Sequence, residues 1–142
     1  MNILVLNGPN LNLLGKREPE IYGQESYTTL VERISDHCLR QGIGVEIRQT
    51  NHEGVLVDWI QEAAGKYDGI VLNPAAYTHT SVALLDAVKA VGIPTVEVHL
   101  SDPDSREDFR HVSYVRHACV AAVKGKGYAG YLEAIDLLAK EI

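Results

Sequence analysis

The sequence has little that marks a disulfide framework, a metal centre or a cofactor-binding loop. Its two cysteines, Cys38 in a predicted helix and Cys119 in a predicted strand, lack the spacing of metal ligands, so we interpret both as reduced, buried residues. No segment matches a P-loop, a zinc pair or a calcium-binding loop. We therefore expect no cofactor and no metal.

Basic residues and long apolar runs are also scarce. The formal charge of -6 disfavours a general nucleic-acid binder, because such proteins take their affinity from clustered cations. The first apolar run ends before Asn7 and carries no basic residue, so it is too short for a signal peptide or a membrane span. We expect a cytoplasmic protein with neither nucleic acid nor membrane as a partner, folded as a single domain over residues 1–142.

What the chain does contain is a regular alternation of short apolar runs and helix-length segments. Strands are predicted near residues 2–6, 44–49, 69–72, 94–98 and 118–123. Helices are predicted over residues 26–41, 54–66 and 80–91, followed by a last helix whose apolar residues are Leu132, Ile135, Leu138 and Ala139. Repeated β-α-β units form parallel sheets that helices cover on both faces. The pattern predicts an α/β three-layer sandwich of the flavodoxin-like kind, with a five-stranded parallel sheet in the order 2-1-3-4-5.

The predicted helix over residues 80–91 carries apolar side chains on every side, and its only charges are Asp86 and Lys89. A helix of this kind is normally buried all round. The sheet covers one face in a domain of this size, so we predict that the other face meets a second copy of the chain. An exposed, alanine-rich outer face is the alternative.

A glycine motif near the C-terminus needs a different interpretation. Residues 125–130, GKGYAG, match the GxGxxG fingerprint of dinucleotide-binding folds. That fingerprint requires a further strand and an acidic residue about twenty positions on, and too few residues follow for either. We interpret these glycines as a turn into the last helix.

A long polar loop, residues 7–23, follows the first predicted strand. Loops of this length usually serve function. The loop supplies amides such as Asn10, the permanent cation of Arg17 and the phenol of Tyr22. Taken singly, each has a structural explanation as a turn residue, a solvated charge or a packing residue. We predict that residues 7–12 form a rigid floor and residues 17–23 a lid.

Polar residues also follow the next three predicted strands. They are residues 51–53 after the second strand, 73–79 after the third and 99–102 after the fourth. Parallel sheets bind ligands outside the carboxyl ends of their strands. These loops therefore predict a site for an oxygen-rich small molecule, although Asn73 also fits a turn.

Glu97 and His99 form a candidate catalytic pair. Residues two apart on a strand face the same side, and a carboxylate beside an imidazole orients it and raises its basicity. Among the other histidines, we interpret His37 as a helix-surface residue and His117 as a strand residue. The role of His111 stays open.

In order along nearly the whole chain, these segments resemble type II 3-dehydroquinate dehydratase. The matching segments are residues 7–15 (NGPNLNLLG), 17–23 (REPEIYG), 51–54 (NHEG), 73–81 (NPAAYTHTS), 97–101 (EVHLS) and 110–111 (RH). The chain departs from the family at Ala75, where glycine is frequent, and at Asp102, where asparagine is common.

The resemblance implies reversible dehydration of 3-dehydroquinate to 3-dehydroshikimate through an enolate, without a Schiff base. The reaction serves the shikimate pathway of aromatic amino acid biosynthesis and also quinate breakdown. The resemblance implies that Tyr22, held as tyrosinate by Arg17, accepts a proton, and that His99 beside Glu97 donates one. Arg17 would also stabilise the transition state, and Asn10 would hold a water at the enolate oxygen.

Substrate contacts follow from the same resemblance. The implied residues are Asn73, His79, Asp86, Leu100, Ser101 and Arg110. The substrate carboxylate is expected at Leu100 and Ser101, and the ring hydroxyls at His79 and Arg110. Asp86 is expected to reach the site of a neighbouring subunit, in a homododecamer built from trimers.

Three other classes of protein share parts of this pattern. A receiver-like signalling domain has the same topology but needs carboxylates where this chain has Asn7 and Asn73. A flavin carrier needs a Ser/Thr/Gly-rich phosphate loop after the first strand, whereas this loop is rich in Asn and Leu. A sugar-acid-binding module without activity fits the same residues, and only turnover distinguishes it.

Overall fold

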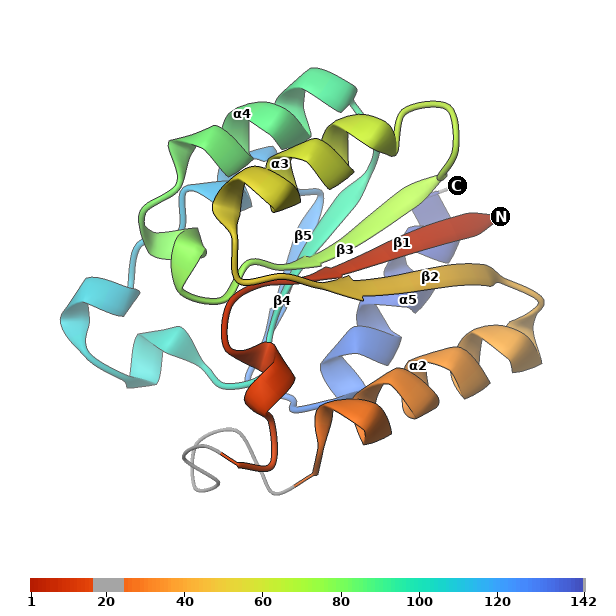
Figure 1. Cartoon of the computed structure of the whole chain (residues 1–142), viewed down its shortest axis with the longest axis horizontal. Coiled ribbons are helices and arrows are strands. Elements are labelled where there is room, and N and C mark those ends of the chain that lie inside the picture. Colours follow the sequence, from red (N-terminus) through yellow and green to blue (C-terminus); the bar gives the residue numbers. More distant parts are fainter. Residues whose placement is uncertain (17–24, 142) are drawn as a thin grey trace.

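Helices cover both faces of a parallel sheet in the computed structural model, which describes residues 1–16 and 25–141 (Figure 1). The strands are β1 (Asn2–Asn7), β2 (Gly44–Gln49), β3 (Gly69–Asn73), β4 (Thr95–His99) and β5 (Ala121–Lys124). They lie in the order β2-β1-β3-β4-β5, and every neighbouring pair is parallel. The predicted fold and strand order are confirmed.

Two helices lie on each face of this sheet, α3 and α4 on one and α2 and α5 on the other (Figure 1). Their bounds are α2 (Tyr27–Gln41), α3 (Glu53–Glu62), α4 (Val82–Val91) and α5 (Ala129–Glu141). Short 3-10 helices fill the connections: η1 (Leu11–Leu13), η2 (Ala75–His79), η3 (Pro103–Ser105), η4 (Asp108–Arg110) and η5 (Val115–Ala118). Within residues 1–16 and 25–141, no helix has both the length and the apolar character to cross a membrane.

The central strand β1 contributes to both layers of the core. Ile3 and Val5 pack with α2 and α5, whereas Leu4 and Leu6 pack with α3 and α4. All four side chains are fully buried. Burial of a side chain of this size stabilises the fold by about 1.5–3 kcal/mol. This two-sided burial explains why the strand is a continuous apolar run rather than an alternating one.

Serine caps mark the starts of α2 and α4. The Ser26 hydroxyl accepts a hydrogen bond from the Thr29 amide at 3.1 Å, as predicted for the start of α2. The Ser81 hydroxyl caps α4 in the same way, so that helix begins at Val82 rather than at residue 80. Helix α3 ends at Glu62, before the predicted residue 66.

The region before β5 differs from the prediction. A strand was expected over residues 118–123, but η5 occupies Val115–Ala118 and β5 begins only at Ala121. Cys119 therefore lies between these elements and not in a strand, and His117 belongs to η5. The Cys119 thiol donates to the Val115 carbonyl oxygen at 3.3 Å, and burial raises the pKa of this thiol to about 12. Both cysteines are free, as predicted, but only Cys38 is fully buried, whereas Cys119 is partly exposed.

His37 links two helices rather than only facing solvent. Its Nε2 lies 2.8 Å from Asp136 Oδ1 on α5. Gln41 Nε2 donates to the same oxygen at 3.3 Å. The sequence correctly places His37 on a helix, but the contact with α5 makes its role structural.

Within one chain, α4 is buried on one face only. Leu84, Ala87 and Val88 are buried, whereas Val82 is 49% exposed and Asp86 is exposed on the outer side. The predicted contact of this outer face with a second copy of the chain stays a prediction.

Candidate active site

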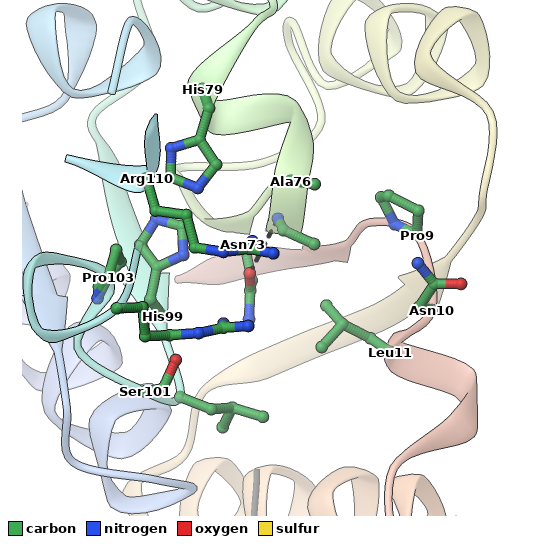
Figure 2. Close-up of a pocket in the computed structure, with 13 residues that line it drawn as sticks. Pro9, Asn10, Leu11, Asn73, Ala76, His79, His99, Ser101, Pro103 and Arg110 are labelled. Carbon is green, nitrogen blue, oxygen red and sulfur yellow. Dashed lines mark hydrogen bonds between the residues drawn. The ribbon is translucent and has the colours of Figure 1, made fainter. Parts of the chain in front are cut away.

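The loops after β1, β3 and β4 line one pocket at the carboxyl ends of the strands (Figure 2). Its lining residues are Pro9, Asn10, Leu11, Asn73, Ala75, Ala76, His79, His99, Leu100, Ser101, Pro103, Arg106 and Arg110. Figure 2 shows His79, His99 and Arg110 together on one side, opposite Pro9 and Asn10. The topology thus brings together three of the four loops that the strand-end argument names, whereas residues 51–53 after β2 are not among the lining residues.

Most of the predicted site residues lie here. Those that line the pocket are Asn10, Asn73, His79, His99, Leu100, Ser101 and Arg110. Glu97 lies directly behind His99. Asp86 is on the exposed face of α4 and is not among the lining residues. Arg17 and Tyr22 fall outside the described residues.

A close backbone contact joins the loops after β1 and β3. The Gly8 amide donates to the Asn73 carbonyl oxygen at 2.8 Å. A Cβ atom added at Gly8 would lie 2.7 Å from the Pro74 carbonyl oxygen, closer than any side chain permits. Glycine is therefore required at this position, and it sets the distance between the two walls of the pocket.

The asparagine-rich floor is held from β2. The Asn10 amide donates to Asn51 Oδ1 at 3.0 Å, and Asn10 itself has a left-handed φ of 69°. Gln49 Nε2 donates to the Gly8 carbonyl oxygen and to Asn51 Oδ1, each at 3.1 Å. Sequence reasoning missed Gln49, because a polar residue at the end of an edge strand has no distinct signal.

Asn73 is fixed by buried partners. Its Nδ2 donates to the Tyr131 hydroxyl at 2.8 Å, and its Oδ1 accepts from the Ala75 amide at 3.1 Å. The Tyr131 hydroxyl in turn donates to Asn7 Oδ1 at 2.6 Å. Burial raises the pKa of the Tyr131 phenol, so it is a neutral donor. One N–H of Asn73 remains for a ligand. Tyr131 was also missed, since it sits on the apolar face of α5.

The predicted pairing of Glu97 and His99 is present. His99 Nε2 lies 2.8 Å from Glu97 Oε2, and both side chains are buried. Because a carboxylate accepts, Nε2 carries the proton, and Nδ1 is the ring nitrogen left for the pocket. Val96 and Val98, on the opposite face of β4, pack in the core with α5.

Several donors surround the Glu97 carboxylate. Thr78 Oγ1 donates to Oε2 at 3.0 Å, Ser113 Oγ to the same oxygen at 2.8 Å, and Arg116 Nε lies 3.5 Å from Oε1. Burial by itself raises the pKa of Glu97, but the hydrogen bond and charge of His99, the Ser113 hydroxyl and the Arg116 charge together lower that pKa to about 2. Glu97 is therefore an ionised group at the base of the pocket.

His79 is held in one tautomer. Its Nδ1 lies 2.7 Å from the Val112 carbonyl oxygen and donates to it. Burial lowers the pKa of His79 despite this hydrogen bond. The neutral ring therefore presents the Nε2 lone pair, an acceptor suited to a hydroxyl group.

Two arginines follow β4. Arg110 lines the pocket, is paired with Glu107 and lies 5.1 Å from the centre of the Phe109 ring. Arg106 also lines the pocket, and it was not predicted. The sequence signal that could have identified Arg106 is its spacing of four residues from Arg110. Together the two arginines make this wall suited to an oxygen-rich, anionic ligand.

The glycines of residues 125–130 support the site without lining the pocket. The Gly127 amide donates to the Leu100 carbonyl oxygen at 3.0 Å, and the Gly125 amide donates to that of Ser101 at 3.2 Å. Both glycines have positive φ, and α5 begins at Ala129, so the interpretation of the motif as a turn is confirmed. Within the part of the chain that the structure describes, no three His, Cys, Asp or Glu side chains gather as metal ligands.

Comparisons with known proteins agree on one family. The sequence profile of Dehydroquinase class II matches residues 1–139. The chain is 54% identical over 143 residues to the 3-dehydroquinate dehydratase of Acidovorax sp. (strain JS42), covering 97% of each chain. It is 53% identical over 137 residues to that of Corynebacterium glutamicum (strain R), covering 96% of this chain and 94% of the relative.

Solved structures give the same result. The type II dehydroquinase from Butyrivibrio crossotus DSM 2876 superposes with a TM-score of 0.97 at 50% identity, covering 98% of this chain and 97% of the other. A two-component response regulator from Clostridium difficile has a TM-score of 0.57 at 12% identity, covering 99% and 96%, and this likeness shows the fold alone. From the profile match and these relatives we conclude that the chain belongs to the class II dehydroquinase family.

Proposed function

We propose that this chain catalyses the reversible trans dehydration of 3-dehydroquinate to 3-dehydroshikimate through an enolate. The observation that carries the proposal is the buried Glu97–His99 pair, which opens onto a pocket lined by amides, an imidazole and guanidinium groups. The names of relatives about half identical over nearly the whole chain support the substrate.

The acid of this reaction is His99. Glu97 occupies Nε2, so the proton that leaves is the one on Nδ1. When the tertiary hydroxyl next to the substrate carboxylate departs, the imidazolium protonates it and water is released. His99 then returns to its neutral form, with Nε2–H still donating to Glu97.

The base in this proposal is Tyr22, deprotonated beside Arg17; both lie outside the described residues. Tyr22 removes a proton from the carbon next to the ketone, and the electron pair moves onto the ketone oxygen. Asn10, at the pocket wall, holds a water that donates to the resulting enolate. Collapse of the enolate expels the hydroxyl group and leaves the conjugated enone. No lysine takes part, so no Schiff base forms.

Each remaining pocket group suits one part of the substrate. The loop of Leu100 and Ser101, fixed by the glycine turn, would receive the carboxylate, with the free N–H of Asn73 alongside. The neutral His79 would accept a hydrogen bond from a ring hydroxyl, and Arg110 would donate one to a ring oxygen.

Asp86 is proposed to act in the site of a neighbouring subunit, because it is exposed on the outer face of α4. That face, with the half-exposed Val82, supports a homo-oligomer. Assembly as a dodecamer built from four trimers and a cytoplasmic location remain predictions.

Turnover tests the proposal directly. Purified protein mixed with 3-dehydroquinate should raise the ultraviolet absorbance of the conjugated enone carboxylate, and borohydride added with substrate should leave the activity intact. Tyr22→Phe and His99→Ala should each lose most of the turnover while staying folded. If substrate bound without any rise in absorbance, the chain would be a sugar-acid-binding module instead.

A further inference from the structure

An arginine outside the pocket lies against the catalytic pair. Arg116 Nε is 3.5 Å from Glu97 Oε1, the carboxylate oxygen that does not contact His99. This nitrogen is buried and makes no hydrogen bond within the described residues, although the whole side chain is 37% exposed. Arg116 belongs to η5 and is not among the residues that line the pocket. Its guanidinium thus faces the carboxylate and not a ligand.

The other partners of Glu97 cannot keep it compensated through the reaction. Thr78 and Ser113 contribute neutral hydroxyls. His99 contributes a positive charge only until it protonates the leaving group. After that step Glu97 would be a buried anion held by neutral donors, which is an unfavourable state. The guanidinium of Arg116 is permanently charged and remains in contact with Oε1.

We propose that Arg116 is a positioning residue that keeps Glu97 ionised after His99 releases its proton and thereby makes His99 a stronger acid. The second cation next to the pair disfavours the imidazolium form and favours the neutral form. The inference rests on the proposed dehydration.

The remaining charged groups around the pair do not substitute for Arg116. They include the titratable groups His79 on η2 and Cys119 after η5, the cations Arg110 on η4 and Lys124 on β5, and the carboxylate of Asp104 on η3, whose pKa the Arg116 charge helps to lower. Glu107 engages the charge of Arg110, and Asp104 engages that of Lys124. Burial keeps the Cys119 thiol and the His79 ring in their neutral forms.

The test compares Arg116→Gln and Arg116→Lys with the wild-type chain, by kcat and KM for 3-dehydroquinate across pH. Arg40→Gln is the matched control, because it removes the same charge from an exposed position on α2. For Arg116→Gln we expect kcat at pH 7 to fall about 3- to 10-fold with KM unchanged, and the alkaline limb of the kcat profile to move up by about 0.5–1 pH unit. Arg116→Lys should keep the limb near its wild-type position.

The experiment distinguishes a failure of the proposed function from a failure of the role proposed for Arg116. A wild-type chain without turnover would refute the proposed function. If the wild type is active and Arg116→Gln has the same kcat and the same alkaline limb, the role of Arg116 is overturned. The proposed function would still stand. A rise in KM with kcat unchanged would overturn the role of Arg116 too, since that change indicates substrate contact. If Arg116→Gln does not fold, Arg116→Met carries the same prediction.

Discussion

Replacing Tyr131 with phenylalanine tests whether the buried polar network behind the pocket holds Asn73 in place. The hydroxyl of Tyr131 accepts from Asn73 Nδ2 at 2.8 Å and donates to Asn7 Oδ1 at 2.6 Å. All three residues are buried, with exposures of 0% for Tyr131, 2% for Asn73 and 0% for Asn7. Tyr131→Phe therefore leaves an amide N–H and an amide oxygen with no replacement partner from water.

The expected magnitude follows from these two groups. A buried polar group that loses its partner costs about 1–3 kcal/mol. Because the ring is retained and no large cavity forms, we expect Tyr131→Phe to lower the free energy of unfolding by about 2–4 kcal/mol. For a domain of this size that is a decrease in Tm of roughly 6–12 °C. Asn73 also loses its anchor, so KM for the substrate should rise several-fold, with a smaller effect on kcat.

Thermal unfolding followed by circular dichroism measures the first effect, and steady-state kinetics the second. Tyr67→Phe is the control, since its hydroxyl makes an exposed hydrogen bond to Glu46, and about 0.5 kcal/mol is the most it should cost. Equal Tm values for the two variants would refute the reasoning, because they would mean that the buried hydroxyl contributes no more than an exposed one.

Three further predictions concern the same site. Since the pKa of Glu97 in the folded chain is about 2, below its ordinary value of 4.5, the stability that its ionisation contributes, about 3 kcal/mol, is present above pH 5 and lost between about pH 4.5 and 2. The stability difference between wild type and Glu97→Gln should shrink over that range, and a difference independent of pH would contradict this. Gly8→Ala forces a Cβ to 2.7 Å from the Pro74 oxygen, so we expect a loss of about 2–3 kcal/mol by urea unfolding together with reduced kcat; wild-type stability would show that the contact relaxes freely. Gln49→Ala removes the hydrogen bonds from Nε2 to Gly8, Asn12 and Asn51, and should lower kcat/KM several-fold while reducing stability by only about 1 kcal/mol; unchanged kinetics would exclude Gln49 from positioning the floor.

Much of the fold could be predicted because its determinants are local. The apolar runs identify β1 to β4 closely, and the Ser26 cap and Gly42 bound α2 as expected. The prediction was wrong where local signals were ambiguous. Residues 118–123 are apolar enough for a strand, but η5 occupies the start of this stretch, because Ser113, bonded to Glu97, also accepts the Arg116 amide at 3.2 Å.

The candidate site was only partly predictable. His99 and Asn73 were found because strand ends converge in a parallel sheet, whereas Arg110 was found through the family resemblance. The residues that hold them were not found, because the sequence alone indicates a packing residue at Tyr131 and a surface charge at Arg116. Their roles depend on which helix covers which strand, and no spacing along the chain contains that information.

The sequence by itself determined the strands and the edge at which polar side chains gather, since periodicity and turn residues act over a few positions. The parallel sheet and its strand order followed from the fold class that the alternation of strands and helices indicates. The sequence also determined that Glu97 and His99 share one face of β4. Only the tertiary structure decided which nitrogen of His99 is left for the pocket, how Asn73 is fixed and what compensates Glu97. Those properties depend on contacts between α5 and β3 and between η5 and β4, where the low polarity of the interior makes each hydrogen bond and charge count for more than it does in water.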